Sequence, residues 1–169
     1  MQLAREGGYD AVHMREVSAR ADVALGTIYR YFSSKDEILA EGLVNWVSQM
    51  RERLARRPRR GATVVEQAVD AMRAAARVDE EAGPMLRALM TAMSSPSSSV
   101  AAASANLHEL MESIVREAIG TPPEGIDIDG VCHVVAHVWS STISQWVGRQ
   151  TPASTMGDDL AVALRLLLR

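Results

Sequence analysis

The stretch from Met14 to Lys35 constrains the fold more than any other, because it holds two short helical patterns separated by a tight turn. The first pattern covers about residues 14–20, the turn residues 21–24, and the second pattern about residues 25–32. Five apolar side chains are spaced so that they can close a small core between these helices: Val17, Ala21, Val23, Ile28 and Phe32. This layout is that of a helix-turn-helix, whose second helix enters the major groove of DNA.

The other face of the second helix carries groups that suit DNA. Gly26 has no side chain, so a sugar-phosphate strand can approach the backbone there. Tyr29 and Tyr31 offer phenols that can donate to phosphate and rings that can touch a thymine methyl. Residues 34–37 fit a capping box that begins the next helix, and its free N–H groups next to Lys35 favour a phosphate. An ordinary helical hairpin with core aromatics is the alternative for this stretch.

Residues 21–35, ADVALGTIYRYFSSK, resemble the TetR-type (tetracycline-repressor-like) transcriptional regulators. The resemblance combines the turn, a Gly-Thr-aliphatic-Tyr recognition helix, its aromatic end and a lysine after the cap, and it extends over residues 1 to about 54. It implies that Arg15 contacts a base or a phosphate and that Lys35 holds a phosphate. The predicted DNA-binding residues are Arg15, Leu25, Gly26, Thr27, Tyr29, Arg30, Tyr31 and Lys35.

The net charge of −3 argues by itself against a nucleic-acid binder, but the charge is unevenly distributed. Residues 1–60 hold 11 Lys and Arg against 8 Asp and Glu, whereas residues 61–169 hold 7 against 13. The basic part of the chain is therefore the part with the helix-turn-helix. Six arginines between Arg51 and Arg60 could face DNA or form a solvated loop, and we favour the loop.

Composition narrows the class of protein further. The chain is 47% apolar over 169 residues, which is enough to bury a core. The single cysteine cannot form an internal disulfide and fits a reducing cytoplasm. There is no apolar run near 18 residues and no basic-then-apolar leader, so we expect a cytoplasmic protein without membrane partners. Residues 1–8 have the pattern of a helix end, and we expect this first helix to be incomplete.

The rest of the sequence has helical spacing throughout and no strand alternation. Thr63 with Glu66 forms a second capping box, Pro84 lies near a helix start, and the acidic residues 79–81 favour a helix N-terminus. The sequence therefore predicts an all-α fold of about nine helices. We expect a helix-turn-helix DNA-binding domain in residues 1–34 and a larger ligand-binding and dimerisation domain in residues 35–169.

The last two predicted helices, residues 128–149 and 160–168, are apolar on several faces, unlike the surface helices of a monomer. A break over residues 151–157 separates them. We predict that they pair with their copies as a four-helix interface about a twofold axis. The predicted interface residues are Val131, Val135, Val138, Leu160, Leu164 and Leu167.

Methionines on adjacent predicted helices together suggest a cavity that can reshape around a large apolar guest, although for any single one of them we favour a place in the core. Tryptophans would supply flat walls, and Arg87, Asn106, His108 and Gln145 would orient a polar head group. We single out Arg87 for a carboxylate or thioester phosphates. The predicted effector-binding residues are Trp46, Met50, Met72, Met85, Arg87, Leu89, Met90, Met93, Leu107, His108, Met111, Trp139, Gln145 and Trp146.

Residues 20–35 and 138–169 resemble the actinobacterial repressors of cholesterol and steroid catabolism. That resemblance implies an effector with a bulky ring system, free or as a coenzyme A thioester. We therefore predict a dimeric, ligand-responsive repressor of a near-palindromic operator, with no cofactor. In the family, an effector changes the separation of the two recognition helices, so that effector and DNA compete through one conformational equilibrium.

The sequence leaves three alternative functions to compare with a repressor: an architectural protein, an enzyme and a metal-binding protein. An architectural DNA-binding protein without an effector would not need an adaptable cavity. An enzyme is not expected, because no nucleophile motif, phosphate loop or acid pair accompanies Ser140 and Ser141. His133 and His137 share a helix face, as zinc ligands can, but no third carboxylate or cysteine stands at ligand spacing. Cys132 points about 100° away from His133, so we predict no metal site.

Overall fold

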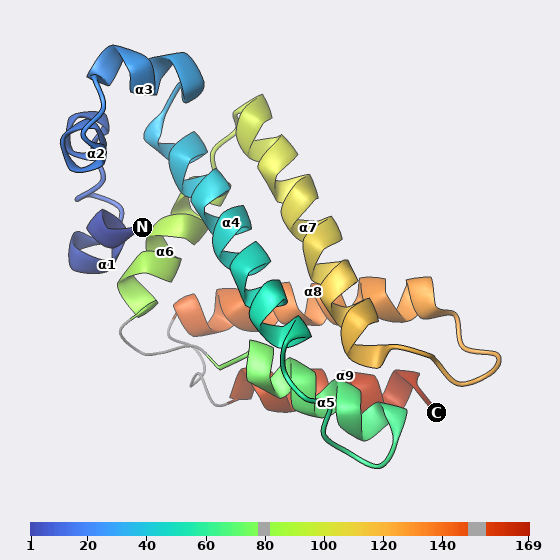
Figure 1. Cartoon of the computed structure of the whole chain (residues 1–169). Coiled ribbons are helices and arrows are strands. Elements are labelled where there is room, and N and C mark those ends of the chain that lie inside the picture. Colours follow the sequence, from blue (N-terminus) through green and yellow to red (C-terminus); the bar gives the residue numbers. More distant parts are fainter. Residues whose placement is uncertain (78–81, 149–154) are drawn as a thin grey trace. The chain divides into compact units, whose positions relative to one another are not determined.

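The computed structural model of the chain describes residues 1–77, 82–148 and 155–169, and these residues form nine α-helices and no strand (Figure 1). The helices are α1 Gln2–Gly7, α2 Met14–Ala21, α3 Leu25–Tyr31, α4 Lys35–Ala55, α5 Val64–Ala75, α6 Gly83–Met93, α7 Ser98–Ile119, α8 Ile128–Val147 and α9 Met156–Leu167. The predicted all-α class is confirmed. The acidic residues 79–81 and most of the predicted break after α8 lie outside the described residues.

Local sequence explains where several helices begin and end. Thr63 caps α5 as predicted: its hydroxyl accepts the N–H of Glu66 at 3.1 Å, and the Glu66 carboxylate accepts the N–H of Thr63 at 3.2 Å. Pro84 lies in the first turn of α6. Backbone N–H groups in this turn have no carbonyl partner within the helix, so the N–H that proline lacks is not missed. α1 ends at Gly7 and is followed by Gly8, whose φ of 68° falls in the region that glycine adopts without strain.

The chain forms two compact units that are not contiguous in sequence. Unit 1 comprises residues 1–46 and 79–107, and unit 2 comprises residues 47–78 and 108–169. Two of the three boundaries fall inside helices, so α4 and α7 each contribute residues to both units. The expected division into residues 1–34 and 35–169 concerns function and stays a prediction. No described helix is both long enough and apolar enough to cross a membrane.

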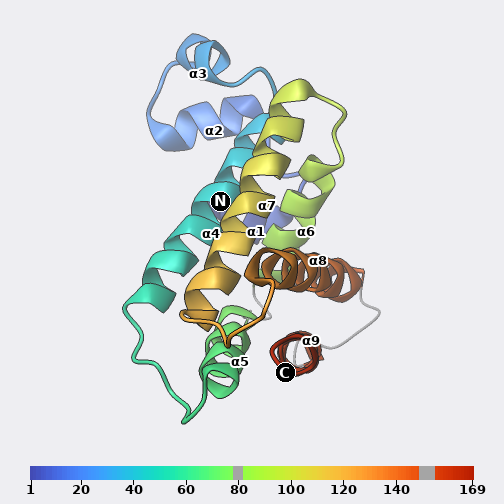
Figure 2. The ribbon, with the colours of Figure 1, turned by 90° about the vertical axis from the view of Figure 1, so that its right-hand side faces the viewer.

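Unit 1 contains the helix-turn-helix and the helices that support it. α1 packs against α6 and α2 packs against α3. Between α4 and α7, the small side chains of Ala40 and Ala103 are buried with Val100, and Val44 and Met93 pack against them. Small residues at this contact let the two helix backbones lie close together (Figures 1 and 2).

Unit 2 is organised around the last helix, because α9 packs against both α5 and α8 (Figure 2). One face of α9 is fully buried, with Leu160 and Leu164 at 0% exposure, while Val162 and Leu166 on another face are 53% and 58% exposed. The guanidinium of Arg73 on α5 also pairs with Asp158 in the first turn of α9, at 2.7 Å.

This packing bears on the predicted dimer interface. Four of the six predicted residues, Val131, Val135, Leu160 and Leu164, are buried within their own chain and cannot reach a second copy in this conformation. Val138 and Leu167 are half-buried. The exposed apolar side chains of α8 and α9 are Val134, Val162 and Leu166, which the sequence analysis did not select. An apolar pattern shows that a helix face is buried, but not whether its own chain or a copy covers it.

Replacing Leu164 with alanine should lower the free energy of unfolding by about 2–5 kcal/mol, because it leaves a cavity where α9 packs into unit 2. Arg165→Ala, at an exposed position of the same helix, is the matched control and should change that free energy by less than about 0.5 kcal/mol. Urea unfolding followed by circular dichroism at one protein concentration measures both. Equal effects of the two substitutions would contradict the packing of α9.

Candidate nucleic-acid interface

The turn between α2 and α3 is closed by hydrogen bonds. Asp22 adopts a left-handed conformation with φ 52° and ψ 44°, and its N–H donates to the carbonyl of Ala19 at 3.4 Å. The N–H of Val23 donates to the carbonyl of Ser18 at 3.1 Å, and the Ser18 hydroxyl donates to the carbonyl of Val23 at 2.5 Å. Asp tolerates this conformation better than most residues. The chain therefore reverses within three residues and starts α3 in a fixed direction.

The apolar residues of the motif are less buried than predicted. Ile28 is buried, and Val17 and Phe32 are half-buried. The prediction was wrong for Ala21 and Val23, which are exposed, Val23 by 37%. The turn is held through the backbone of Val23 rather than through its side chain, so the structure does not require Val23 to pack.

The predicted recognition surface of α3 is exposed. Tyr29 and Tyr31 are 53% and 66% exposed, which rules out the alternative of a hairpin with core aromatics. The guanidinium of Arg30 lies 5.1 Å from the ring centroid of Tyr31 and donates to its hydroxyl at 3.2 Å. This pair presents a cation and a phenol together on the end of the helix. Such groups are typical of contacts to phosphates and base edges.

The remaining predicted DNA-contacting residues of α2 and α3 differ in how far they are exposed. Arg15, in the first turn of α2, and Gly26 are exposed, whereas Leu25 and Thr27 are half-buried. A Cβ built on Gly26 would meet no atom within 4 Å, so the packing of the chain itself does not require glycine there. The missing side chain leaves room for a group from outside the chain, as a close phosphate strand would need.

The start of α4 is capped, in a slightly different way from the prediction. The Ser34 hydroxyl accepts the N–H of Glu37 at 3.2 Å, as a capping box requires. The return bond is shifted by one residue, because the Glu37 carboxylate accepts the N–H of Ser33 at 2.6 Å, and not that of Ser34. Lys35 follows the cap directly, at the first residue of α4.

Tyr9 holds the lysine in place, a role that the sequence analysis missed. The ammonium of Lys35 donates to the Tyr9 carbonyl at 3.2 Å and lies 3.7 Å from the centroid of the Tyr9 ring. The Tyr9 hydroxyl donates to the Asp36 carboxylate at 2.5 Å, and this bond raises the pKa of Tyr9 to about 12. An ammonium has three donors, so Lys35 retains others for a phosphate. The contact spans 26 residues, and no local pattern signals it.

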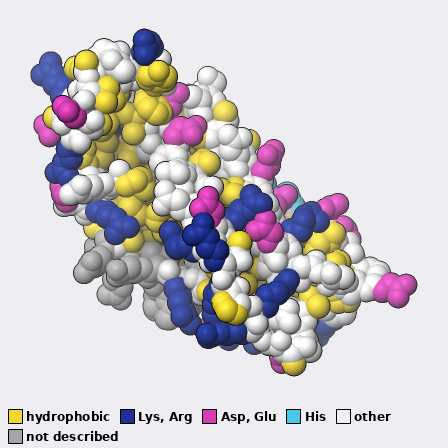
Figure 3. Space-filling model, in the orientation of Figure 1, with side chains coloured by type: hydrophobic (Ala, Val, Ile, Leu, Met, Phe, Trp, Pro, Cys, Tyr) yellow, Lys and Arg dark blue, Asp and Glu magenta, His cyan; other side chains and the backbone are white. Residues whose placement is uncertain are grey.

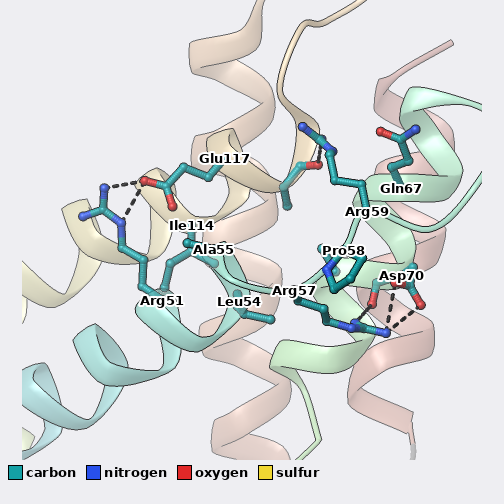
Figure 4. A pocket seen from close by; sticks show the side chains of 12 residues that line it. Arg51, Leu54, Ala55, Arg57, Pro58, Arg59, Gln67, Asp70, Ile114 and Glu117 are labelled. Atoms are coloured by element: carbon teal, nitrogen blue, oxygen red, sulfur yellow. Dashed lines mark hydrogen bonds and ion pairs between the residues drawn. The ribbon is translucent and has the colours of Figure 1, made fainter.

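The arginine-rich segment after α4 is largely engaged within unit 2. Arg57 pairs with Asp70 at 3.0 Å, Arg59 donates to the carbonyls of Ala118 and Ile119, and Arg51 pairs with Glu117 (Figure 4). The residues around these pairs enclose a pocket of about 290 Å³. Figure 3 shows several basic side chains on the part of this surface that lies over the end of α4 and over α5. The prediction of a solvated loop is therefore only partly right, because several arginines of this segment bond to residues of other helices.

The predicted effector residues divide between the two units. Trp46, Met85, Arg87, Leu89, Met90, Met93 and Leu107 belong to unit 1, and Met50, Met72, His108, Met111, Trp139, Gln145 and Trp146 belong to unit 2. None of them lines the pocket beside Arg57. Met72, Met85 and Leu89 are fully buried, whereas Gln145 is exposed and donates to the Ser141 hydroxyl at 3.3 Å. The effector site therefore stays a prediction.

Comparisons with known proteins agree with this architecture. Residues 1–41 match the family of bacterial regulatory proteins, tetR family, and residues 61–167 match the tetracyclin repressor-like C-terminal domain. The HTH-type transcriptional repressor KstR of Mycobacterium tuberculosis is 32% identical over 169 residues, covering 99% of this chain and 76% of that protein. KstR of Mycolicibacterium smegmatis is 33% identical over 171 residues, covering 99% and 82%.

A solved structure shares the fold. The crystal structure of a TetR transcriptional regulator from Rhodococcus sp. RHA1 superposes with a TM-score of 0.80 at 23% identity. The match covers 99% of this chain and 89% of the other.

Proposed function

The chain belongs to the TetR family of bacterial regulatory proteins, and we propose that it is a ligand-responsive transcriptional repressor that reads its operator with the exposed face of α3. Its curated relatives are DNA-binding repressors, which supports a regulator rather than an enzyme. Such a protein works in the cytoplasm, where it has access to DNA.

One observation carries the DNA-binding part of the proposal: the second helix of a helix-turn-helix exposes two tyrosines and an arginine beside an open glycine. If the two tyrosines were buried, they would belong to the hydrophobic core rather than to a binding surface. If other atoms crowded Gly26, the glycine would be explained by packing within the chain. In this arrangement Tyr29 and Arg30 supply contacts to bases and phosphates, while Lys35 supports a phosphate from the start of α4.

The assembly is proposed as a homodimer on a near-palindromic site, because two half-sites one helical turn apart need two recognition helices. The exposed apolar side chains on α8 and α9 support an interface at these helices. Val134 is 44% exposed on α8, and Val162 and Leu166 lie on the open face of α9.

The effector is proposed to be a large apolar molecule with a ring system, of the steroid or acyl-thioester class. The proposal rests on the resemblance of residues 20–35 and 138–169 to repressors of steroid catabolism, and on the methionines buried in both units. Arg87, half-buried on α6, is the cation proposed for an acidic head group. An architectural protein without an effector remains the alternative.

Selection from random duplexes should enrich a near-palindromic site whose binding weakens steeply with salt. Gly26→Ala should reduce affinity for that site, because the new methyl group occupies the space proposed for the DNA strand. The same substitution should keep the free energy of unfolding or raise it by about 0.5–1 kcal/mol, since alanine favours a helix. Asn45→Ala, at an exposed position of α4, is the control and should bind DNA normally.

Two results would contradict DNA recognition by α3. The selection would enrich no particular sequence, or the Gly26→Ala variant would bind the operator with unchanged affinity. Lys35→Ala adds a separate readout, because loss of one phosphate contact should lower the slope of log affinity against log salt by about one.

Substitution of Leu166 by glutamate should give a folded monomer that binds the operator weakly, because a charge then lies in the proposed interface. Leu164→Glu, two residues earlier and fully buried, should instead unfold unit 2. Sedimentation and circular dichroism separate these outcomes. An unmodified chain that sediments as a stable monomer at micromolar concentration is incompatible with the proposed dimer.

Steroid acids and their coenzyme A thioesters should raise the melting temperature and change operator affinity, and DNA should change their affinity by the same factor. Arg87→Ala should weaken binding of the acids and thioesters more than binding of uncharged steroids. Arg77→Ala, which removes an exposed arginine, is the control. A panel of apolar ligands that alters neither melting nor DNA binding would favour the architectural alternative.

A further inference from the structure

Three of the four histidines in the sequence come together in unit 2. His133 and His137 lie one turn apart on α8, and His108 faces them from α7. One ring nitrogen from each lies within 4.8 Å of the others. Glu112 lies one turn after His108 on the same helix, so that two adjacent helices each contribute two side chains.

The rings approach as closely as metal ligands do. The Nε2 atoms of His133 and His137 are 3.2 Å apart, and Nδ1 of His133 is 3.5 Å from Nε2 of His108. Imidazole nitrogens bind Zn²⁺ at about 2.0–2.1 Å, which places two nitrogens of a tetrahedral site about 3.4 Å apart. The separation of the Nε2 atoms of His133 and His137 matches this spacing. The His108 ring, whose Nε2 faces Nδ1 of His133, has to turn before it can share an ion with them.

Glu112 determines which nitrogen of His133 is available. Its carboxylate oxygen lies 2.9 Å from Nδ1 of His133 and 3.1 Å from Nε2 of His108. Because a carboxylate can only accept, the neutral His133 ring carries its proton on Nδ1 when it bonds to Glu112. The Nε2 lone pair of the neutral ring then points to His137. A carboxylate that orients a histidine in this way is the usual partner of a metal-bound imidazole.

We propose that His108, His133 and His137 bind one divalent transition-metal ion of the Zn²⁺ class, with Glu112 as the residue that orients His133. Three imidazoles leave one position of a tetrahedral ion for water or another ligand. The ring nitrogens lie up to 4.8 Å apart, whereas a tetrahedral site needs about 3.4 Å between them. Rotation of the partly exposed side chains can supply the difference of about 1.4 Å. His133 is 58% exposed and His108 33% exposed.

The site lies outside the helix-turn-helix. All four residues belong to unit 2. Val134, the exposed apolar residue of α8, follows His133 directly and so points about 100° away from it around the helix. Cys132 is fully buried and takes no part in the site.

The sequence predicts no metal site, because no third ligand stands near His133 and His137 in the chain. The third histidine lies 25 residues earlier on another helix, and only the packing of α7 beside α8 brings it there. From the sequence alone, His108 is predicted to belong to the effector site.

The test titrates Zn²⁺ into the full-length protein, with any polyhistidine tag removed, by equilibrium dialysis against a metal-free reference. One Zn²⁺ per chain is expected, together with a rise in melting temperature that a chelator reverses, because only the folded chain assembles the ligands. Co²⁺ should give the visible absorption of a tetrahedral site. Absence of saturable binding at one ion per chain would overturn the proposal.

Substitutions assign the ligands. His133→Ala and His137→Gln should each abolish the Co²⁺ band and the stabilisation, while His13→Ala, which removes the one histidine outside the cluster, should preserve both. Glu112→Gln should weaken Zn²⁺ binding about 10–100-fold. Circular dichroism without metal checks that each variant folds, as expected for exposed positions. Undiminished Zn²⁺ binding in folded His133→Ala and His137→Gln would refute the assignment.

Discussion

The recognition helix α3 is only seven residues long, and a helix of that length is not stable in water by itself. Its position therefore depends on what holds its two ends. At the start, the left-handed Asp22 and the bonds between Ser18 and Val23 fix its direction. In its middle, Ile28 is buried, and beyond its end the capped start of α4 follows after three residues. The exposed tyrosines can face DNA because these anchors, and not the tyrosines, hold the helix.

Lysine 35 connects this motif to the segment before it. Its ammonium rests on the ring and carbonyl of Tyr9, while the hydroxyl of the same tyrosine binds Asp36. The first residues of α4 thus contact the segment that connects α1 to α2, and they also follow the end of the recognition helix. A phosphate bound at this point would be held by a group whose position is already set, which reduces the entropy lost on binding.

Features encoded within a few residues could be predicted from the sequence, and features made by distant packing could not. The cap at Thr63, the stop at Gly8 and the turn before Leu25 depend on local hydrogen bonds and backbone conformation, and each is found where the sequence places it. The apolar face of Leu160 and Leu164 was recognised, but its cover is α5 and α8 of the same chain. The approach of His108 to His133 is likewise a product of tertiary packing.

The contact between Lys35 and Tyr9 has a chemical consequence, because Lys35 is the only lysine in the sequence. Every acylation of a lysine side chain must therefore occur on the surface proposed to hold a phosphate. Such a modification removes the positive charge and with it both the contact to the Tyr9 ring and the attraction to DNA. The rate of acylation at Lys35 itself, followed in the peptide that contains it, reports how often the ammonium leaves the tyrosine. An amine-reactive label therefore measures the opening of this contact once reaction at the amino terminus is counted separately.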